Sequence, residues 1–291
     1  MKRVHCLTRL AFVLVVIAAA GCASVTPPPA VTPSPLIGVQ LWSVKDEIKR
    51  DFEGTLLKLT SLGFQGVEFA GEFGRFREDP KGLRDFLRNK GLLCAGAHVS
   101  LAQLSADKFD ATTTFYKAAS CTDLIIAFEP RAFTVAGSGP VASELTTLSV
   151  KLAPLGMRIG YHNHAEEMAG VEGQTAWDVL AQGTPSDVIL QQDIGWTHFA
   201  GKSPVALIKR YPGRSVSLHY KAKVPKGAGG VPLIGQDGTD WSAVTHAAGG
   251  VGGTRWLIVE QEEYPNGMGQ LEAVAASMRR LQAVLALIAA R

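Results

Sequence analysis

Eight short apolar segments alternate with longer amphipathic stretches along most of this chain. The apolar segments are rich in Val, Ile and Leu and predict strands near residues 37–42, 65–70, 92–98, 123–128, 157–162, 187–193, 215–220 and 255–260. The stretches between them predict helices at 52–62, 82–90, 141–155, 174–182 and 204–211, with a final helix at 270–290. Nearly continuous apolar strands are typical of parallel sheets that are buried on both faces.

Eight strand–helix units between residues 36 and 291 predict a single (β/α)8 TIM barrel, the α/β fold of this repeat number and length. The alternative is an open, doubly wound sheet. That fold favours a glycine-rich phosphate turn after the first strand. The residues here are Gln40, Leu41, Trp42 and Ser43, which favours the barrel.

The first 35 residues are predicted to direct export rather than to join the fold. Residues 1–21 combine Lys2, Arg3 and Arg9 with an apolar run at 10–20, the pattern of a secretory signal. Small residues before Cys22 resemble a bacterial lipobox, so we expect Cys22 to be lipidated. Residues 22–35 are rich in proline and predict an extended tether. The expected location is therefore a bacterial membrane, with the barrel facing the periplasm or cell exterior; the alternative is an ordinary secretory signal.

The charge balance excludes a nucleic-acid role. The chain carries 29 Lys and Arg against 26 Asp and Glu, but three of the basic residues lie in the predicted signal. The remainder is electrically neutral, so a nucleic-acid role has no electrostatic support. The two cysteines of the folded part, Cys94 and Cys121, stand near strand starts. We expect two free buried thiols, because neighbouring parallel strands seldom offer disulfide geometry.

Polar side chains gather where the predicted strands end. The active site of a TIM-barrel enzyme lies at the C-terminal ends of the strands. Side chains able to bind a metal or transfer a proton stand at nearly every such end of this chain. They are Gln40 and Trp42, Glu68, His98, Glu129, His162 and His164, Asp193, His219, and Glu260.

Three of these residues predict a catalytic metal site. Asp193, His219 and Glu260 end the sixth, seventh and eighth strands. Two carboxylates and an imidazole suit Mn²⁺, Co²⁺, Zn²⁺ or Mg²⁺. Three protein ligands would leave positions open for substrate oxygens, which is typical of catalytic rather than structural sites.

Several segments together resemble the xylose isomerase-like TIM barrels of the sugar phosphate isomerase/epimerase superfamily. They are 37–46 (IGVQLWSVKD), 63–68 (GFQGVE), 161–164 (YHNH), 193–196 (DIGW), 219–221 (HYK) and 259–261 (VEQ), in the family's order. The resemblance covers residues 36–290 and implies a metal-dependent enzyme that abstracts a proton beside a sugar carbonyl.

The resemblance also implies roles for single residues. The family's metal ligands on strands six to eight match Asp193, His219 and Glu260, while its strand-five Glu aligns with Gly160. His162 is the nearest substitute ligand. The implied proton-transfer and catalytic groups are His162, His164, Glu260 and Lys221, and the implied substrate-binding residues are Gln40, Trp42, Glu68, His98, Trp196 and His198.

The expected substrate is a non-phosphorylated sugar, keto-sugar or polyol, since exported enzymes meet few sugar phosphates. The expected reaction is an isomerisation or epimerisation; a dehydratase or lyase of the same fold remains an alternative. A tethered sugar-binding module without catalysis is the second alternative, which Gly160 favours and the retained ligands oppose. Relatives often pair, so a homodimer is possible.

Overall fold

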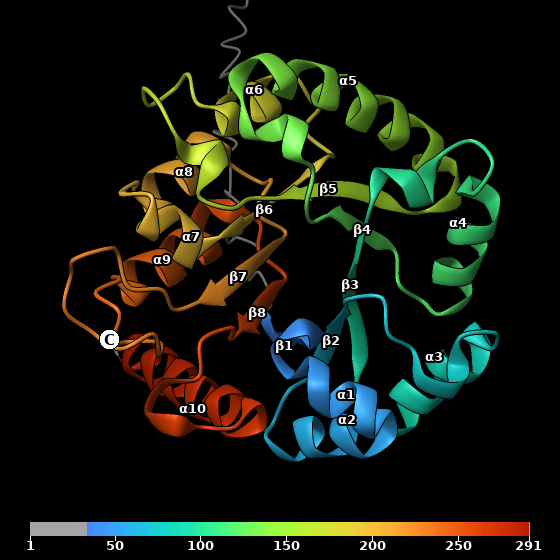
Figure 1. Cartoon of the computed structure of the whole chain (residues 1–291), viewed down its shortest axis with the longest axis horizontal. Helices are drawn as coiled ribbons and strands as arrows, with labels where there is room; N and C mark the ends of the chain where they lie inside the picture. Colours follow the sequence, from blue (N-terminus) through green and yellow to red (C-terminus); the bar gives the residue numbers. More distant parts are fainter. Residues whose placement is uncertain (1–33, 291) are drawn as a thin grey trace, which may run out of the picture. The chain divides into compact units, whose positions relative to one another are not determined.

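The computed structural model describes residues 34–290, and these form a closed barrel of eight parallel strands. The strands follow one another around the barrel in sequence order, with β8 closing against β1 (Figure 1). Their bounds are β1 Leu36–Gln40, β2 Gly66–Phe69, β3 Leu93–Val99, β4 Asp123–Ile126, β5 Arg158–His162, β6 Ile189–Asp193, β7 Ser217–Lys221 and β8 Trp256–Glu260. The predicted TIM-barrel architecture is confirmed.

Ten α-helices of the described residues surround the strands in Figure 1. They are α1 Lys45–Arg50, α2 Phe52–Ser61, α3 Pro80–Asn89, α4 Phe109–Ala118, α5 Val135–Leu152, α6 Ala176–Gln182, α7 Ile194–Phe199, α8 Pro204–Arg210, α9 Trp241–Ala247 and α10 Gln270–Ala289. Helix α5 begins six residues before its predicted start. Thr134 caps it by accepting a hydrogen bond from the Gly137 backbone N–H, and Pro140 lies within the helix.

The barrel interior changes from apolar at the base to polar at the C-terminal end. Ile125, Ile189 and Val216 form one buried cluster in the lower part. Side chains two residues apart point to the same face of a strand, so Gln191 and then Asp193 follow Ile189 on the inner face of β6. The inward-facing residues of β6 therefore change along the strand. Ile189 lies in the apolar lower layer, which we call the apolar floor, and Gln191 and Asp193 lie in the polar layers above it.

Trp256 fills the base of the barrel beside β1 and β2. A β-carbon added to Gly66 would lie 2.5 Å from Trp256 Cη2. The absence of a side chain at Gly66 therefore makes room for the indole, which is almost fully buried with Ala95 and Ile258.

A disulfide joins Cys94 in β3 to Cys121, two residues before β4. The prediction of two free thiols is wrong. Because Ala97 pairs with Leu124 across the two strands, the cysteines three residues earlier lie opposite each other, with their Cα atoms 5.2 Å apart. That separation is within the range that disulfides require.

The predicted signal, Cys22 and nearly all of the tether lie outside the described residues. Within residues 34–290, none of the helices combines the length and hydropathy needed to span a bilayer.

Candidate active site

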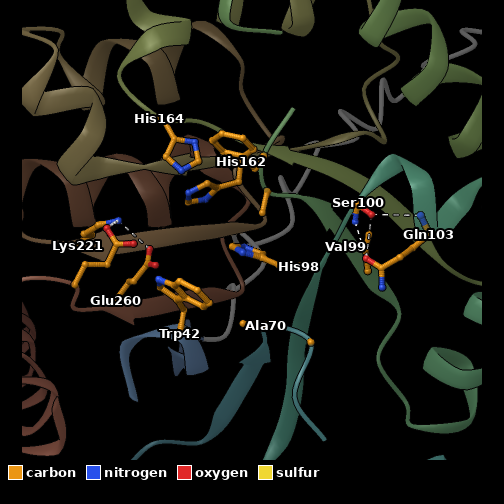
Figure 2. Close-up of a pocket in the computed structure, with 14 residues that line it drawn as sticks. Trp42, Ala70, His98, Val99, Ser100, Gln103, His162, His164, Lys221 and Glu260 are labelled. Atoms are coloured by element: carbon orange, nitrogen blue, oxygen red, sulfur yellow. Dashed lines mark hydrogen bonds and ion pairs between the residues drawn. The ribbon is translucent and has the colours of Figure 1, made fainter. Parts of the chain in front are cut away.

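A cavity of about 510 Å³ opens at the C-terminal ends of the strands. Figure 2 shows His98, His162, Lys221 and Glu260 converging on it, with Trp42 beside them and Ser100 and Gln103 further out. Trp42 and Phe128 are large and exposed, at 44% and 61% of their surface. The full lining is Trp42, Ala70, Gly71, His98, Val99, Ser100, Gln103, Ala127, Phe128, His162, His164, Lys221, Glu260 and Glu262.

Glu68 on β2 is a fully buried carboxylate beneath this cavity. Its Oε2 accepts hydrogen bonds from Gln40 Nε2 at 2.7 Å and His219 Nε2 at 2.6 Å, and His98 Nε2 lies 3.1 Å away. Burial alone would raise the pKa of Glu68, but the charges and hydrogen bonds of His98 and His219 outweigh it and hold the pKa below its usual range. Glu68 is therefore an ionised acceptor.

His219 on β7 lies between two carboxylates. Its Nε2 faces Glu68 at 2.6 Å and its Nδ1 faces Glu260 Oε2 at 2.7 Å. Burial would lower the pKa of His219, but the charges of Glu68 and Glu260 raise it to about 10. Because the Nε2–H donates to Glu68, Nδ1 is the nitrogen that faces the other candidate ligands. A carboxylate that accepts from one ring nitrogen, as Glu68 does here, orients the imidazole for metal binding through the other nitrogen.

Four buried side chains could hold a metal ion. One ligand atom each from His162, Asp193, His219 and Glu260 lies within 4.8 Å of the others. Asp193 Oδ2 is buried and has no hydrogen-bond partner among the described residues. Buried polar atoms are almost always satisfied, so an orphaned carboxylate oxygen among three potential ligands fits a bound cation. The residues present therefore fit the predicted divalent metal, for which His162 would supply the fourth ligand.

Asp193 is held rigidly at the junction of β6 and α7. Its Oδ1 accepts a hydrogen bond from the Trp196 backbone N–H at 2.8 Å, and its own N–H donates to Asn163 Oδ1 at 2.9 Å. These bonds turn Oδ2 toward the cluster. Burial raises the pKa of Asp193 to about 6, although Lys221 opposes the rise.

Lys221 at the end of β7 is a buried ammonium among carboxylates. Its Nζ lies 3.6 Å from Asp193 Oδ2 and 3.5 Å from Glu260 Oε2, and it contacts Glu262. Burial would lower the pKa of Lys221, but Glu260, Asp193 and Glu262 raise it above its ordinary value. Lys221 is therefore a permanent cation of the site, with three acidic partners.

His162 and His164 both contact the cavity and are uncharged at neutral pH. Burial lowers the pKa of His162 well below its usual value, helped by the positive charge of His219. Burial also lowers the pKa of His164 to about 4. Both rings therefore have an unprotonated nitrogen at neutral pH and can accept a hydrogen bond or a proton, and the lowered pKa makes each ring a weaker base than a free imidazole.

The other predicted substrate-binding residues fall into different places. Trp42, His98 and His164 line the cavity, whereas Gln40 and Glu68 lie beneath it. Trp196 packs against His164, with ring centroids 5.7 Å apart, and lies under Lys221.

His198 does not join the residues that line the cavity. It lies in the last turn of α7 with its Nε2 near Gly238. Its place on the helix turns it toward the loop before α9, so a contact with substrate in this cavity is not supported. Glu129 ends up in an ion pair with Arg131.

Gly160 lies one layer below the candidate metal ligands. A β-carbon there would come within 2.6 Å of Ile125 Cδ1 and 2.8 Å of Ile189 Cβ. Gly160 therefore belongs to the apolar floor, and His162, two residues further on, occupies the layer of the ligands. The alignment that placed the strand-five ligand at Gly160 is corrected by this packing.

Sequence reasoning missed Gln191, the buried amide at the centre of the site. It lies on β6 two residues before Asp193, and the period-two alternation of a strand could have indicated its inward position. Glu167 was missed too, and no motif marks it. Its carboxylate accepts hydrogen bonds from Tyr161 Oη and the His164 backbone N–H, both at 2.8 Å, and it anchors the loop that carries His164.

No family model matches the chain. The rhizopine catabolism protein MocC of Rhizobium meliloti is 30% identical over an alignment of 141 residues, which covers 42% of each protein. The matched part is thus less than half of that relative's length.

Solved structures share the fold at low sequence identity. A sugar phosphate isomerase/epimerase from Parabacteroides distasonis has a TM-score of 0.68 at 21% identity, over 84% of this chain and 97% of that one. The IOLI protein, solved with a bound zinc atom, has a TM-score of 0.65 at 14% identity, over 87% of this chain and 99% of that one. The neighbours are xylose isomerase-like barrels, so the chain has the fold that the sequence motifs implied.

Proposed function

We propose that this protein is a metal-dependent enzyme that abstracts a proton beside the carbonyl of a non-phosphorylated sugar or keto-sugar, as an isomerase or epimerase does. The observation that carries the proposal is the buried quartet of His162, Asp193, His219 and Glu260 under an open cavity, with Asp193 Oδ2 lacking a hydrogen-bond partner among the described residues. A divalent ion held there would polarise a carbonyl oxygen and acidify the neighbouring C–H. The names of the structural neighbours agree with this chemistry.

The protein's own residues supply proton transfer and charge. His164 is neutral, lines the cavity and lies outside the quartet, so it is the ring that can accept a proton from substrate. His162, whose ring is also neutral, serves as a ligand in this proposal. Glu260 would hold the metal with one oxygen and is in reach of Lys221. Lys221 places a fixed positive charge beside the oxygen on which negative charge develops, an electrostatic effect that lowers the barrier to proton abstraction.

The charges of the cavity favour a substrate without phosphate. Among the described residues that line it, Lys221 is the single lysine or arginine. Its charge is already opposed by Asp193, Glu260 and Glu262. Apart from the proposed metal, a phosphate dianion would therefore meet carboxylates and no further lysine or arginine of the lining.

We also propose that the enzyme is exported and lipid-anchored at Cys22, acting outside the cytoplasm. The disulfide between Cys94 and Cys121 supports this location, because disulfides persist in oxidising compartments and are rare in the cytosol.

The test measures metal content and proton exchange on one preparation. Purified protein, before and after chelation, is assayed for bound metal and then incubated in D₂O with a panel of keto-sugars and their phosphate esters. We expect stoichiometric metal, and deuterium incorporation next to the carbonyl that chelation abolishes and added metal restores. Exchange restricted to the phosphate esters would refute the substrate class.

The same experiment separates the alternatives. Loss of water or of a leaving group after exchange would indicate a dehydratase or lyase instead of an isomerase. Sugar binding without exchange, unaffected by chelation and by His219→Ala, would indicate a binding module and contradict the proposal.

A further inference from the structure

Gln191 has four polar partners beneath the cavity, and packing alone does not explain its role. It is completely buried. Its Nε2 donates to Glu68 Oε1 at 2.6 Å and to Ser217 Oγ at 2.9 Å. Its Oε1 faces His98 Nε2 at 2.9 Å and His162 Nδ1 at 3.2 Å.

The orientation of this amide follows from the chemistry of its neighbours. An ionised carboxylate can only accept hydrogen bonds, so the amide nitrogen of Gln191 must face Glu68. The two N–H groups of that nitrogen are then used by Glu68 and Ser217. The carbonyl oxygen is left facing the two histidines, and it can only accept.

A fixed acceptor decides where the proton lies on each ring. His98 must carry its proton on Nε2, and His162 must carry its proton on Nδ1, because each donates to the same oxygen. In a neutral imidazole the other nitrogen is then a free acceptor. That acceptor is Nδ1 in His98 and Nε2 in His162, and His162 Nε2 is the nitrogen that faces Asp193 at 3.8 Å.

We propose that Gln191 is a positioning residue that sets the tautomers of His98 and His162, so that each presents one unprotonated nitrogen to the site. It touches neither the cavity nor the predicted ligand atoms of Asp193 and Glu260. The role deepens the proposed function and rests on it for its chemical use, since a histidine can hold a metal or take a proton only through an unprotonated nitrogen.

The tautomers can be read directly by NMR on protein labelled with ¹⁵N-histidine and freed of metal. Long-range ¹H–¹⁵N correlation spectra distinguish the Nδ1–H from the Nε2–H form. Single substitutions of His98 and His162 assign their signals. The expected result is Nδ1–H for His162 and Nε2–H for His98; the opposite form at His162 in the wild-type protein would overturn the proposal whatever any variant does.

The variant Gln191→Met keeps the bulk and removes both the donors and the acceptor. We expect His162 to lose its single tautomer and shift toward Nε2–H, and metal affinity to fall by about 10- to 100-fold, the usual cost of losing a hydrogen-bond partner behind a ligand. The matched control is Gln192→Met, a buried glutamine on the same strand whose Nε2 instead contacts Thr197 Oγ1 at 3.2 Å. The control should leave both tautomers unchanged.

Two further outcomes are decisive. An unchanged His162 spectrum in folded Gln191→Met would show that the amide only fills space. Wild-type protein with the stated tautomers but without metal retention or proton exchange would refute the proposed function and leave the role of Gln191 standing.

Discussion

Asp193 and His162 face each other from the neighbouring strands β6 and β5, with 3.8 Å between Asp193 Oδ2 and His162 Nε2. The carboxylate oxygen has no hydrogen-bond partner among the described residues, although the side chain is fully buried. We therefore expect Asp193→Asn, which keeps the shape and removes the charge, to abolish stoichiometric metal retention, as measured by elemental analysis after gel filtration.

The matched control is Asp123→Asn. Asp123 begins β4, at the opposite end of the barrel, and pairs with Arg158 at 2.7 Å. It should leave the metal content unchanged. Equal metal content in both variants would show that Asp193 is not a ligand.

Lys221 should matter most when no metal is present. Removing its charge in Lys221→Met leaves Asp193, Glu260 and Glu262 without the ammonium that they share, and breaking one partner of a buried ion pair costs about 3–5 kcal/mol. A metal ion would neutralise two of these carboxylates, Asp193 and Glu260, so we expect its addition to restore most of the lost free energy of unfolding. Urea titrations with chelator and with Mn²⁺ measure both quantities.

Lys223→Met is the comparison for Lys221→Met, because Lys223 pairs with Glu263 at 2.8 Å and lies over the Trp196 ring. We expect little change in stability and no dependence on metal. Should Lys221→Met unfold in chelator at the wild-type urea concentration, the three carboxylates would not need this cation.

The strand ends could be predicted from the sequence because buried parallel strands are continuous apolar runs, and the barrel then brings their ends together. Asp193, His219 and Glu260 were found in this way. Other features depend on packing that no local pattern encodes. The need for a glycine at position 160 comes from the bulk of Ile125 and Ile189, which leaves no room for a side chain there. The pairing of Cys94 with Cys121 depends on the register between β3 and β4.

Glu167 should make the protein less stable as the pH rises toward neutrality. Burial raises its pKa to about 7, against the hydrogen bonds from Tyr161 and the His164 backbone. Its folded-state pKa lies above its unfolded value of 4.5. The stability that protonated Glu167 gives the folded state is therefore fully present below pH 4.5 and is lost as the pH rises through about 7. This pKa shift corresponds to a loss of about 3 kcal/mol in the free energy of unfolding across that pH range.

The variant Glu167→Gln cannot ionise and tests this directly. We expect the difference in unfolding free energy between pH 5 and pH 8 to be smaller in the variant than in the wild type, by denaturant titration at each pH. Parallel pH dependences in the two proteins would show that Glu167 does not titrate in this range.

The disulfide should stabilise the fold without affecting the site. It closes a loop with a sequence separation of 27 residues, for which chain entropy predicts about 3.5 kcal/mol. We expect the double variant Cys94→Ala, Cys121→Ala to lose stability of this order in urea titrations. Metal content should stay the same, since the cysteines lie toward the base of the barrel. Wild-type protein insensitive to reductant in the same titration would count against the bond.

Gly160 and His162 should respond in opposite ways to substitution, because they lie on one face of β5 in different layers. In Gly160→Ala the new β-carbon meets Ile125 Cδ1 at 2.6 Å and the Ile189 backbone oxygen at 2.9 Å. The backbone cannot move aside as a side-chain tip can, so overpacking should cost about 1–3 kcal/mol.

His162→Glu instead places a carboxylate among the other ligands. We expect it to fold only with metal bound, since the extra buried charge needs a cation, and to retain that metal stoichiometrically. Thermal unfolding with and without metal measures both variants. If Gly160→Ala has normal stability and His162→Glu loses its metal, residue 160 and not residue 162 is the strand-five position that corresponds to the family's metal ligand.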